Sequence, residues 1–302
     1  MLSTPHTSFL DAFLGARSSD VWLVWSVYKL GVESLGDLKN QRKSARSFLR
    51  LAARRALHAQ QTTRRAPRLA LRVVLKCQVS MRLNESLLLQ GPLARLVPYR
   101  PEHVPQYHAW MQDPALLELT CSEPLSLEEE RANQISWCED ELKLTFIVCA
   151  APPGEPLGDL RRGMAGDVNA FFIAWDTESD EPAAHGADPS SQPLLAEVEI
   201  MVAETAQRRR GLGREASLLF LQYVASHVPR VCAFCAKIGE DNEPSLRLFE
   251  QLGFREHKRL TAFKQVELRM PLTAEVHSRL RDECTALGAT EEEVSLGAAP
   301  SQ

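Results

Sequence analysis

The stretch AETAQRRRGLGREASLLFLQYV, residues 203–224, decides how the chain folds. An alternating strand pattern, LLAEVEIMVAE at 194–204, leads into it, and its second half has apolar residues at helical spacing. Gly211 and Gly213 lie among arginines where the strand gives way to the helix. The first turn of a helix presents free N–H groups and the positive end of the helix dipole, and glycine lets a ligand approach the backbone. The pattern therefore predicts a site for a phosphate-bearing group, most simply a pyrophosphate.

Two other phosphate-binding turns fit this stretch less well. A P-loop needs a Lys followed by Ser or Thr after its second glycine, and here Arg214 follows Gly213. A dinucleotide-binding turn needs an acidic residue at the end of a following strand, and no acidic residue stands at the required distance. A glycine start to a helix with solvated arginines and no ligand stays open on this stretch alone.

A second stretch, NEPSLRLFEQLGF at residues 242–254, decides between these alternatives. Taken with RRRGLG at 208–213, it resembles the paired motifs of the GNAT superfamily of acetyl-CoA-dependent N-acetyltransferases. The text around them, including GDVN at 166–169 and EIMVAE at 199–204, is similar to the N-acetyltransferase 9-like branch, which resembles the ribosomal-protein Nα-acetyltransferases. The resemblance covers residues 81–275. The matching motif positions are Arg208, Gly211, Gly213, Asn242, Ser245, Leu248, Phe249, Gly253 and Phe254.

The resemblance implies an α/β (α+β) fold with a mixed central sheet whose middle strands splay apart, flanked by helices. Acetyl-CoA, as co-substrate, lies in the gap of such a sheet, with its pyrophosphate on residues 208–214 and its pantetheine arm against the backbone of residues 201–203. No metal is implied. The cofactor-binding residues carried over in this way are Met201, Val202, Ala203, Arg208, Arg209, Arg210, Gly211, Leu212, Gly213, Arg214, Asn242, Ser245 and Phe249.

The implied reaction is direct transfer of the acetyl group to a protein or peptide amine, with an N-terminal α-amine favoured over a lysine. Glu197 is the first candidate for the base, because the resemblance places it at the strand position of a glutamate base in several family members. Glu199, on the same strand face, is the second, although both residues fit equally well as solvated positions of a sheet face. Phe249 stands where the family often has a tyrosine that protonates the CoA thiolate. That difference keeps open a non-catalytic adaptor with the same fold.

The rest of the 81–275 domain alternates between strand and helix patterns. Ser126, followed three residues later by Glu129, predicts a capping box at the start of one helix. An earlier helical segment is expected to break at Asp113-Pro114. Strands are expected at 94–99, 143–150, 166–175, 194–204 and 231–238 and over 260–270, with helices after residue 101, after Ser126, from about Gly213 and at 245–253.

The first eighty residues differ from the rest in charge. They contain 14 Lys and Arg but 4 Asp and Glu, whereas the net charge of the whole chain is −4. We interpret residues 1–80 as a basic, poorly ordered extension. An import presequence and a nucleic-acid or membrane-surface arm are the alternatives. The first would give a mitochondrial rather than a cytoplasmic location, and nucleic acid is expected to be a partner only through this segment, if at all.

The remaining features carry less information. Residues 276–302 are expected to form a helix fragment and then a disordered tail that begins at the glutamates Glu291 to Glu293. The seven cysteines are scattered, and Cys232 and Cys235 lie in a strand pattern without further ligands at zinc spacing, so a metal site is not expected. No apolar run reaches the length of a membrane span, and no membrane partner is expected.

Overall fold

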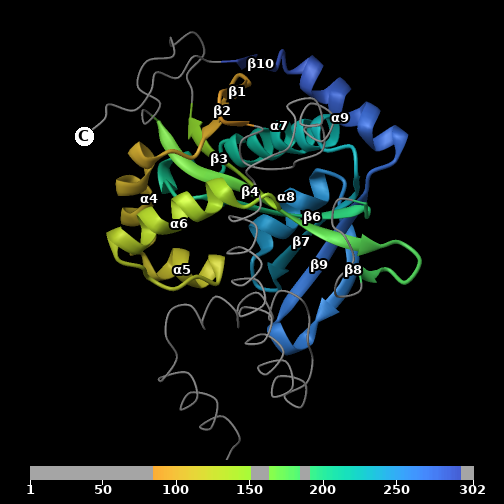
Figure 1. The fold of residues 1–302 in the computed structure, drawn as a ribbon, viewed down its shortest axis with the longest axis horizontal. Coiled ribbons are helices and arrows are strands. Elements are labelled where there is room, and N and C mark those ends of the chain that lie inside the picture. The colour runs from red at the N-terminus through yellow and green to blue at the C-terminus, as the bar shows by residue number, and fades with distance from the viewer. Residues whose placement is uncertain (1–83, 151–162, 184–190, 294–302) are drawn as a thin grey trace, which may run out of the picture. The chain divides into compact units, whose positions relative to one another are not determined.

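The structure is a computed structural model, and it describes residues 84–150, 163–183 and 191–293. One mixed sheet organises this part of the chain, with strand order β10-β1-β2-β3-β4-β6-β7-β9-β8 and a short strand, β5, paired with β4 (Figure 1). The strands are β1 Leu87–Gln90, β2 Ala94–Pro98, β3 Lys143–Ala150, β4 Met164–Asp176, β5 Glu181–Pro182, β6 Leu194–Val202, β7 Val231–Gly239, β8 Arg255–Leu260, β9 Gln265–Pro271 and β10 Thr290–Glu293.

The helices begin and end at local signals that the sequence contains. Asp113 caps the helix that starts at Pro114, and Ser126 and Glu129 form the predicted capping box. Short 3₁₀ turns cover Pro101–His103, Thr205–Gln207 and Thr261–Phe263. The helices are α4 Val104–Trp110, α5 Pro114–Thr120, α6 Leu127–Glu139, α7 Leu212–His227, α8 Glu243–Gln251 and α9 Ala274–Ala286.

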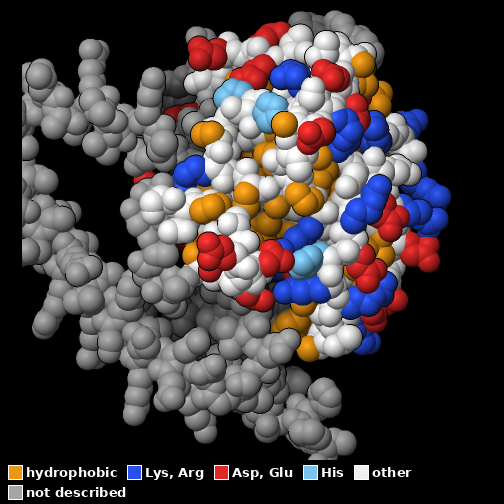
Figure 2. Space-filling view, turned by 90° about the vertical axis from the view of Figure 1, so that its right-hand side faces the viewer, with side chains coloured by type: hydrophobic (Ala, Val, Ile, Leu, Met, Phe, Trp, Pro, Cys, Tyr) orange, Lys and Arg blue, Asp and Glu red, His pale blue; other side chains and the backbone are white. Residues whose placement is uncertain are grey.

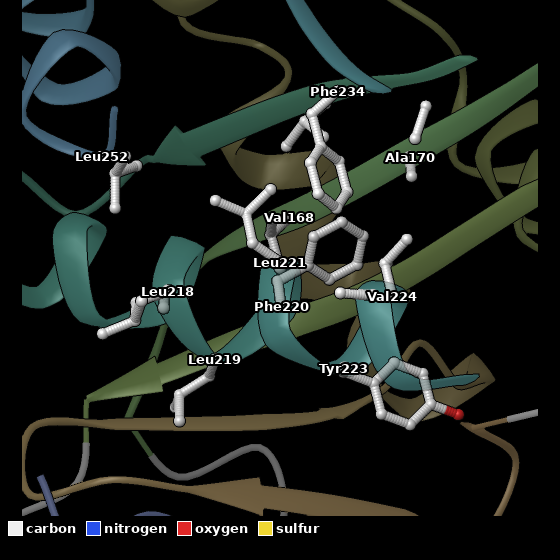
Figure 3. Close-up of a cluster of buried hydrophobic side chains, with 14 of the residues drawn as sticks. Val168, Ala170, Leu218, Leu219, Phe220, Leu221, Tyr223, Val224, Phe234 and Leu252 are labelled. Carbon is white, nitrogen blue, oxygen red and sulfur yellow. The ribbon is translucent and has the colours of Figure 1, made fainter. Parts of the chain in front are cut away.

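One face of the sheet is apolar and packs against α7, α8 and α9. Even-numbered residues of the central strands β3, β4, β6 and β7 face this core, because successive residues of a strand point to opposite faces. Phe220 of α7 is fully buried, and its ring meets Phe146 of β3 edge to face at 6.1 Å. Figure 3 shows Phe220 and Val224 of α7 against Val168, Ala170 and Phe234 of the sheet. Helix α7 is thereby fixed over the centre of the sheet.

The opposite face of the sheet carries polar side chains from five strands, and helices α4, α5 and α6 pack over its β2–β3 side through an aromatic cluster. Tyr99, Tyr107 and Trp137 lie in that cluster, with Tyr99 and Tyr107 ring centroids 5.2 Å apart. We call the polar side chains on this face the polar row: Lys143, Thr145, Asp167, Asn169, Glu197, Glu199, Lys237, Glu267 and Arg269.

The two middle strands, β6 and β7, run parallel but separate along their length. They pair from Leu194 and Val231 to Glu197 and Cys235, and the pairing stops there. Beyond that point β6 continues to pair with β4, and β7 with β9. The predicted mixed sheet with splayed middle strands is confirmed, and the gap opens toward the start of α7.

The side of the sheet at β8 and β9 carries charges of both signs. Arg269 contacts Asp180 in the β4–β5 turn at 2.5 Å, and Arg259 pairs with Glu256 at 2.7 Å. Seen from the right-hand side of Figure 1, where β8 and β9 lie, Lys and Arg side chains mix with Asp and Glu around a group of hydrophobic side chains (Figure 2). This edge therefore presents no single sign of charge.

Three expectations need correction. The glutamates placed in a disordered tail form β10, which pairs with β1 from Leu87↔Glu293 to Gln90↔Thr290. The domain does not end at residue 275, because Leu280 and Cys284 of α9 are buried in the main core. The last strand, expected over 260–270, is β9 and begins only at Gln265 after a 3₁₀ turn, and the strand β8 that precedes this turn was not expected. The predictions for residues 1–80 and for the end of the tail lie outside the described residues.

Candidate functional site

The predicted turn has a geometry suited to an anion. Gly211 caps α7 with a φ of +89°, in the left-handed region that favours glycine. The first helical hydrogen bond runs from the Glu215 N–H to the Gly211 carbonyl, so the N–H groups of Leu212, Gly213 and Arg214 precede it. A Cβ at Gly213 would lie 3.5 Å from Val202 and 3.8 Å from Leu248, which are ordinary contacts, so the helix start packs beside β6 and α8.

The arginines of the turn have different surroundings. Arg208 is bonded to the end of β6: its Nε donates to the Val202 carbonyl at 2.7 Å, and its Nη2 to the Ala203 carbonyl at 3.1 Å. Arg214 pairs with Glu283 of α9 at 3.1 Å. Arg209 and Arg210 are exposed. Arg208 therefore holds the turn against the strand, which differs from the phosphate contact expected from the motif, whereas Arg209 and Arg210 present their charge to solvent beside the turn.

A carboxylate ties this turn to the edge of the sheet. Glu215, in the first turn of α7, is buried, and its Oε1 accepts the N–H groups of Leu93 at 2.7 Å and Ala94 at 2.9 Å. Leu93 lies in the β1–β2 turn, and its Cδ1 is 3.3 Å from the place a Cβ at Gly211 would take. The hairpin β1–β2 is therefore anchored at the first turn of α7, beside the predicted anion site.

The splayed part of β6 offers backbone groups to a ligand. The Ala203 N–H donates to the Ala165 carbonyl at 2.7 Å, and the β4–β6 register is regular up to Val202↔Gly166. Successive residues of an antiparallel strand direct their backbone groups to opposite sides. Met201 and Ala203 thus bond toward β4, while Ile200 and Val202 direct theirs toward the gap. Of the predicted residues 201–203, Val202 faces the gap; Ile200 does so too, and it was not predicted.

The second motif builds the start of α8. The Asn242 side chain caps the helix by accepting the Ser245 N–H at 3.3 Å. Phe249 is buried in the main core, and its ring meets Phe254 edge to face at 5.0 Å. Asn242 and Ser245 therefore form the cap of α8, whereas Phe249 packs as a core residue.

The two candidate bases are in unlike environments. Glu197 is 2% exposed and forms an ion pair with Lys237 of β7, with 3.0 Å between Oε2 and Nζ. Glu199 lies one pleat further toward the gap, is half-buried, and stands directly opposite Asn169 of β4. The Lys237 ammonium contacts Oε2 of Glu197 and the carboxylate is buried, so Glu197 is less accessible to a substrate amine than Glu199.

The structure adds a carboxyl that the sequence analysis missed. Asp167 of β4 is 2% exposed and accepts a hydrogen bond from Asn169. Burial is the main cause that raises the pKa of Asp167 to about 7, with Glu199 and Glu130 acting in the same direction. The sequence signal for this carboxyl was the pair Asp167 and Asn169, which lie on one face of an otherwise apolar strand. Polar residues are unusual in a strand that is buried on both faces, so such a pair indicates a functional or structural role.

Comparison with known proteins agrees with this geometry. The model of a family described as an acetyltransferase (GNAT) domain matches residues 94–255. The chain belongs to the GNAT acetyltransferases. It is 42% identical over 195 residues to the alpha/beta-tubulin-N-acetyltransferase 9 of Mus musculus, covering 64% of this chain and 74% of that protein. It is 45% identical over 192 residues to the N-acetyltransferase 9-like protein of Nematostella vectensis, covering 63% and 88%.

Among solved structures, Mycobacterium smegmatis RimJ in complex with CoA-disulfide aligns with a TM-score of 0.46 and 16% identity, over 66% of this chain and 95% of that one. The family identifies the chain as an acetyl-CoA-dependent acetyltransferase, which confirms the predicted enzyme class and the predicted resemblance to N-acetyltransferase 9 proteins. Within the described ranges, no three His, Cys, Asp or Glu residues are grouped to hold a metal ion, and no helix is long and apolar enough to cross a membrane.

The contacts of Arg208 give a first prediction. Arg208→Ala removes two hydrogen bonds that hold the turn to β6, and we expect acetyl-CoA affinity to fall about tenfold or more, since a hydrogen bond from a charged group is worth roughly 1.5–3 kcal/mol. Isothermal titration measures the affinity, and faster trypsin cleavage at Arg209 and Arg210 would report the loosened turn. Arg281→Ala, on the exposed side of α9, is the control. An unchanged affinity in Arg208→Ala would contradict the assigned role.

Proposed function

We propose that this GNAT enzyme acetylates a protein or peptide amine, with an N-terminal α-amine favoured over a lysine side chain. The observation that carries the proposal is the gap between β6 and β7 with the polar row beside it, so that a cofactor in the gap has carboxylates on one side. The names of the mouse and human relatives, alpha/beta-tubulin-N-acetyltransferase 9, support a protein substrate.

Direct transfer needs an amine that has lost its proton. In this proposal Glu199 takes that proton, because it stands on the strand that lines the gap, nearer to the gap than Glu197. The neutral amine then attacks the thioester carbon, the carbon–nitrogen bond forms, the carbon–sulfur bond breaks, and CoA leaves as the thiolate. Backbone N–H groups at Ile200 and Val202, directed toward the gap, are the available donors for the developing oxyanion.

This scheme has no side-chain hydroxyl at position 249 to protonate the leaving CoA thiolate. Phe249 has no hydroxyl group with which to protonate the sulfur, and its ring is packed against Phe254. Tyr107 and Tyr99 are the tyrosines on the polar-row side, and burial raises the pKa of Tyr107 well above its usual range, so it is a neutral phenol. The missing hydroxyl at Phe249 favours one second candidate, a GNAT-fold adaptor that binds CoA without turnover.

Turnover separates the two candidates. We expect the full chain to bind acetyl-CoA in a titration experiment and to release CoA in the presence of a library of peptides with free N-termini. Glu199→Gln should keep acetyl-CoA binding and lower kcat/KM by about a hundredfold, in the range for loss of a general base. Glu292→Gln, exposed on β10, is the control. Binding without turnover on any peptide would favour the adaptor, and the absence of acetyl-CoA binding would contradict both.

A further inference from the structure

The turn between β1 and β2 lies beside the start of α7. It contains Pro92 and Leu93, and a hydrogen bond from the Gly91 N–H to the Ala94 carbonyl at 2.9 Å closes it. The residues that match the family model begin at Ala94, so Pro92 and Leu93 lie outside the match. The contacts that this turn makes with α7 are therefore separate from the motifs that identify the cofactor site.

Two features fix the backbone of this turn against α7. Glu215, which is 4% exposed, accepts the N–H groups of Leu93 at 2.7 Å and Ala94 at 2.9 Å through one oxygen, Oε1. A Cβ at Gly91 would lie 2.4 Å from the same oxygen, so a side chain there would displace the carboxylate from both N–H groups. Hydrogen bonds to an ionised acceptor are stronger than those between neutral groups. The backbone at Leu93 therefore has a fixed position next to the helix start.

The Leu93 side chain is exposed although its backbone is anchored. It is 43% exposed, and its Cδ1 lies 3.3 Å from the place that a Cβ at Gly211 would take. Arg209 and Arg210, which directly precede Gly211, are exposed as well. One apolar side chain and two cations therefore lie together beside the glycine that caps α7.

The helix start has a different neighbour on each side. A Cβ at Gly213 would be nearest to Val202 of β6 and Leu248 of α8, whereas a Cβ at Gly211 would be nearest to Leu93. Val202 belongs to a strand that lines the gap, so the Gly213 side is the gap side and the Gly211 side is the hairpin side. In acetyl-CoA the pyrophosphate joins the pantetheine arm to the adenosine. A pantetheine arm in the gap and a pyrophosphate at the helix start leave the adenosine for the hairpin side.

We propose that Leu93 is part of the acetyl-CoA site and contacts the adenine ring, so that the β1–β2 turn forms the wall of the site on the hairpin side. The flat face of an adenine ring can pack on an aliphatic side chain, and covering the exposed leucine removes apolar surface from water. Arg209 and Arg210 supply positive charge for the phosphate group on the ribose of the cofactor. Glu215 holds the leucine in place. This contact is independent of the amine that the enzyme acetylates.

Methyl NMR on the full chain tests the contact directly. With the leucine methyl groups labelled with ¹³C, the Leu93 signals are those that disappear in Leu93→Ser. Saturating acetyl-CoA should shift these signals and give nuclear Overhauser contacts between them and the ring protons of adenine. Bound acetyl-CoA without such contacts to Leu93 would overturn the proposal. A chain that binds no acetyl-CoA would overturn it too, whereas a lack of turnover on peptides would contradict only the proposed function.

Isothermal titration measures what the contact contributes. Leu93→Ser keeps both backbone N–H groups that Glu215 accepts and removes the apolar contact, so we expect the Kd for acetyl-CoA to rise about fivefold. Leu93→Met keeps an apolar side chain of similar volume and should bind like the parent. Ile135→Ser, at a 54% exposed position of α6, is the control and should leave the Kd unchanged. An unchanged Kd in Leu93→Ser, or an equal rise in Ile135→Ser, would overturn the proposal.

Discussion

Gly211→Val should abolish acetyl-CoA binding while leaving the fold in place. The φ of +89° at Gly211 is strained for a β-branched residue, and the added Cβ would lie 3.3 Å from Leu93 Cδ1, so the turn that precedes the free N–H groups of the helix start has to shift. We expect at least a hundredfold loss of affinity, equivalent to roughly 2.7 kcal/mol. Isothermal titration measures the loss, and far-ultraviolet circular dichroism checks the fold.

A second glycine with positive φ serves as a control for the effect of backbone strain alone. Gly288 has a φ of +68° and nothing within 4 Å of an added Cβ, and it follows α9. Gly288→Val should lower the melting temperature to a similar degree and leave acetyl-CoA affinity unchanged. If Gly211→Val binds acetyl-CoA like the parent, the pyrophosphate does not lie on this turn.

The largest effect on stability is expected at Lys237. Burial lowers the pKa of Lys237, but Glu197 and other neighbours more than offset this and raise it above the ordinary value, so the pair is ionised. Lys237→Met leaves the Glu197 carboxylate buried without its cation, and we expect the free energy of unfolding to fall by about 3–5 kcal/mol. Urea denaturation at pH 7 measures this change.

A second substitution tests whether the loss comes from the unpaired charge. Adding Glu197→Leu to Lys237→Met removes that charge and should recover most of the stability, since an apolar pair of similar volume often replaces a buried ion pair without cost. Arg259→Met, which breaks an exposed pair with Glu256, should change stability by less than about 1 kcal/mol. A loss in Lys237→Met no larger than that in Arg259→Met would mean that Glu197 is solvated.

The parts of the fold that depend on neighbouring residues were predictable from the sequence. The cap at Ser126, the break at Asp113 and the glycine turn at Gly211 are local, because each is set by backbone groups within a few residues. The gap between β6 and β7 was predicted from the resemblance of the two motifs to a family. No local pattern in either strand indicates that the two strands separate.

The parts that depend on strand order were not predictable. Glu197 forms an ion pair with Lys237, forty positions further along the chain. Nothing in the sequence of either strand predicts this ion pair. The edge strands β8 and β10 lack apolar alternation because nearly all of their side chains are exposed. Asp167 was overlooked because it is defined by its surroundings, which come from β3, β6, two helices and Tyr99 after β2, rather than by its own sequence context.

The pairing of β10 with β1 has a consequence for how the chain acquires its structure. One partner lies at the start of the described domain and the other at its end, so during synthesis Leu87 to Gln90 emerge long before the strand that covers them. Until then that edge exposes unpaired N–H and C=O groups and the apolar side chains of three leucines, a combination that invites association between nascent chains. The Glu215 carboxylate, which grips the β1–β2 turn from α7, can order this hairpin earlier. Helix α7 can thus hold the first hairpin in place until β10 is synthesised and pairs with β1.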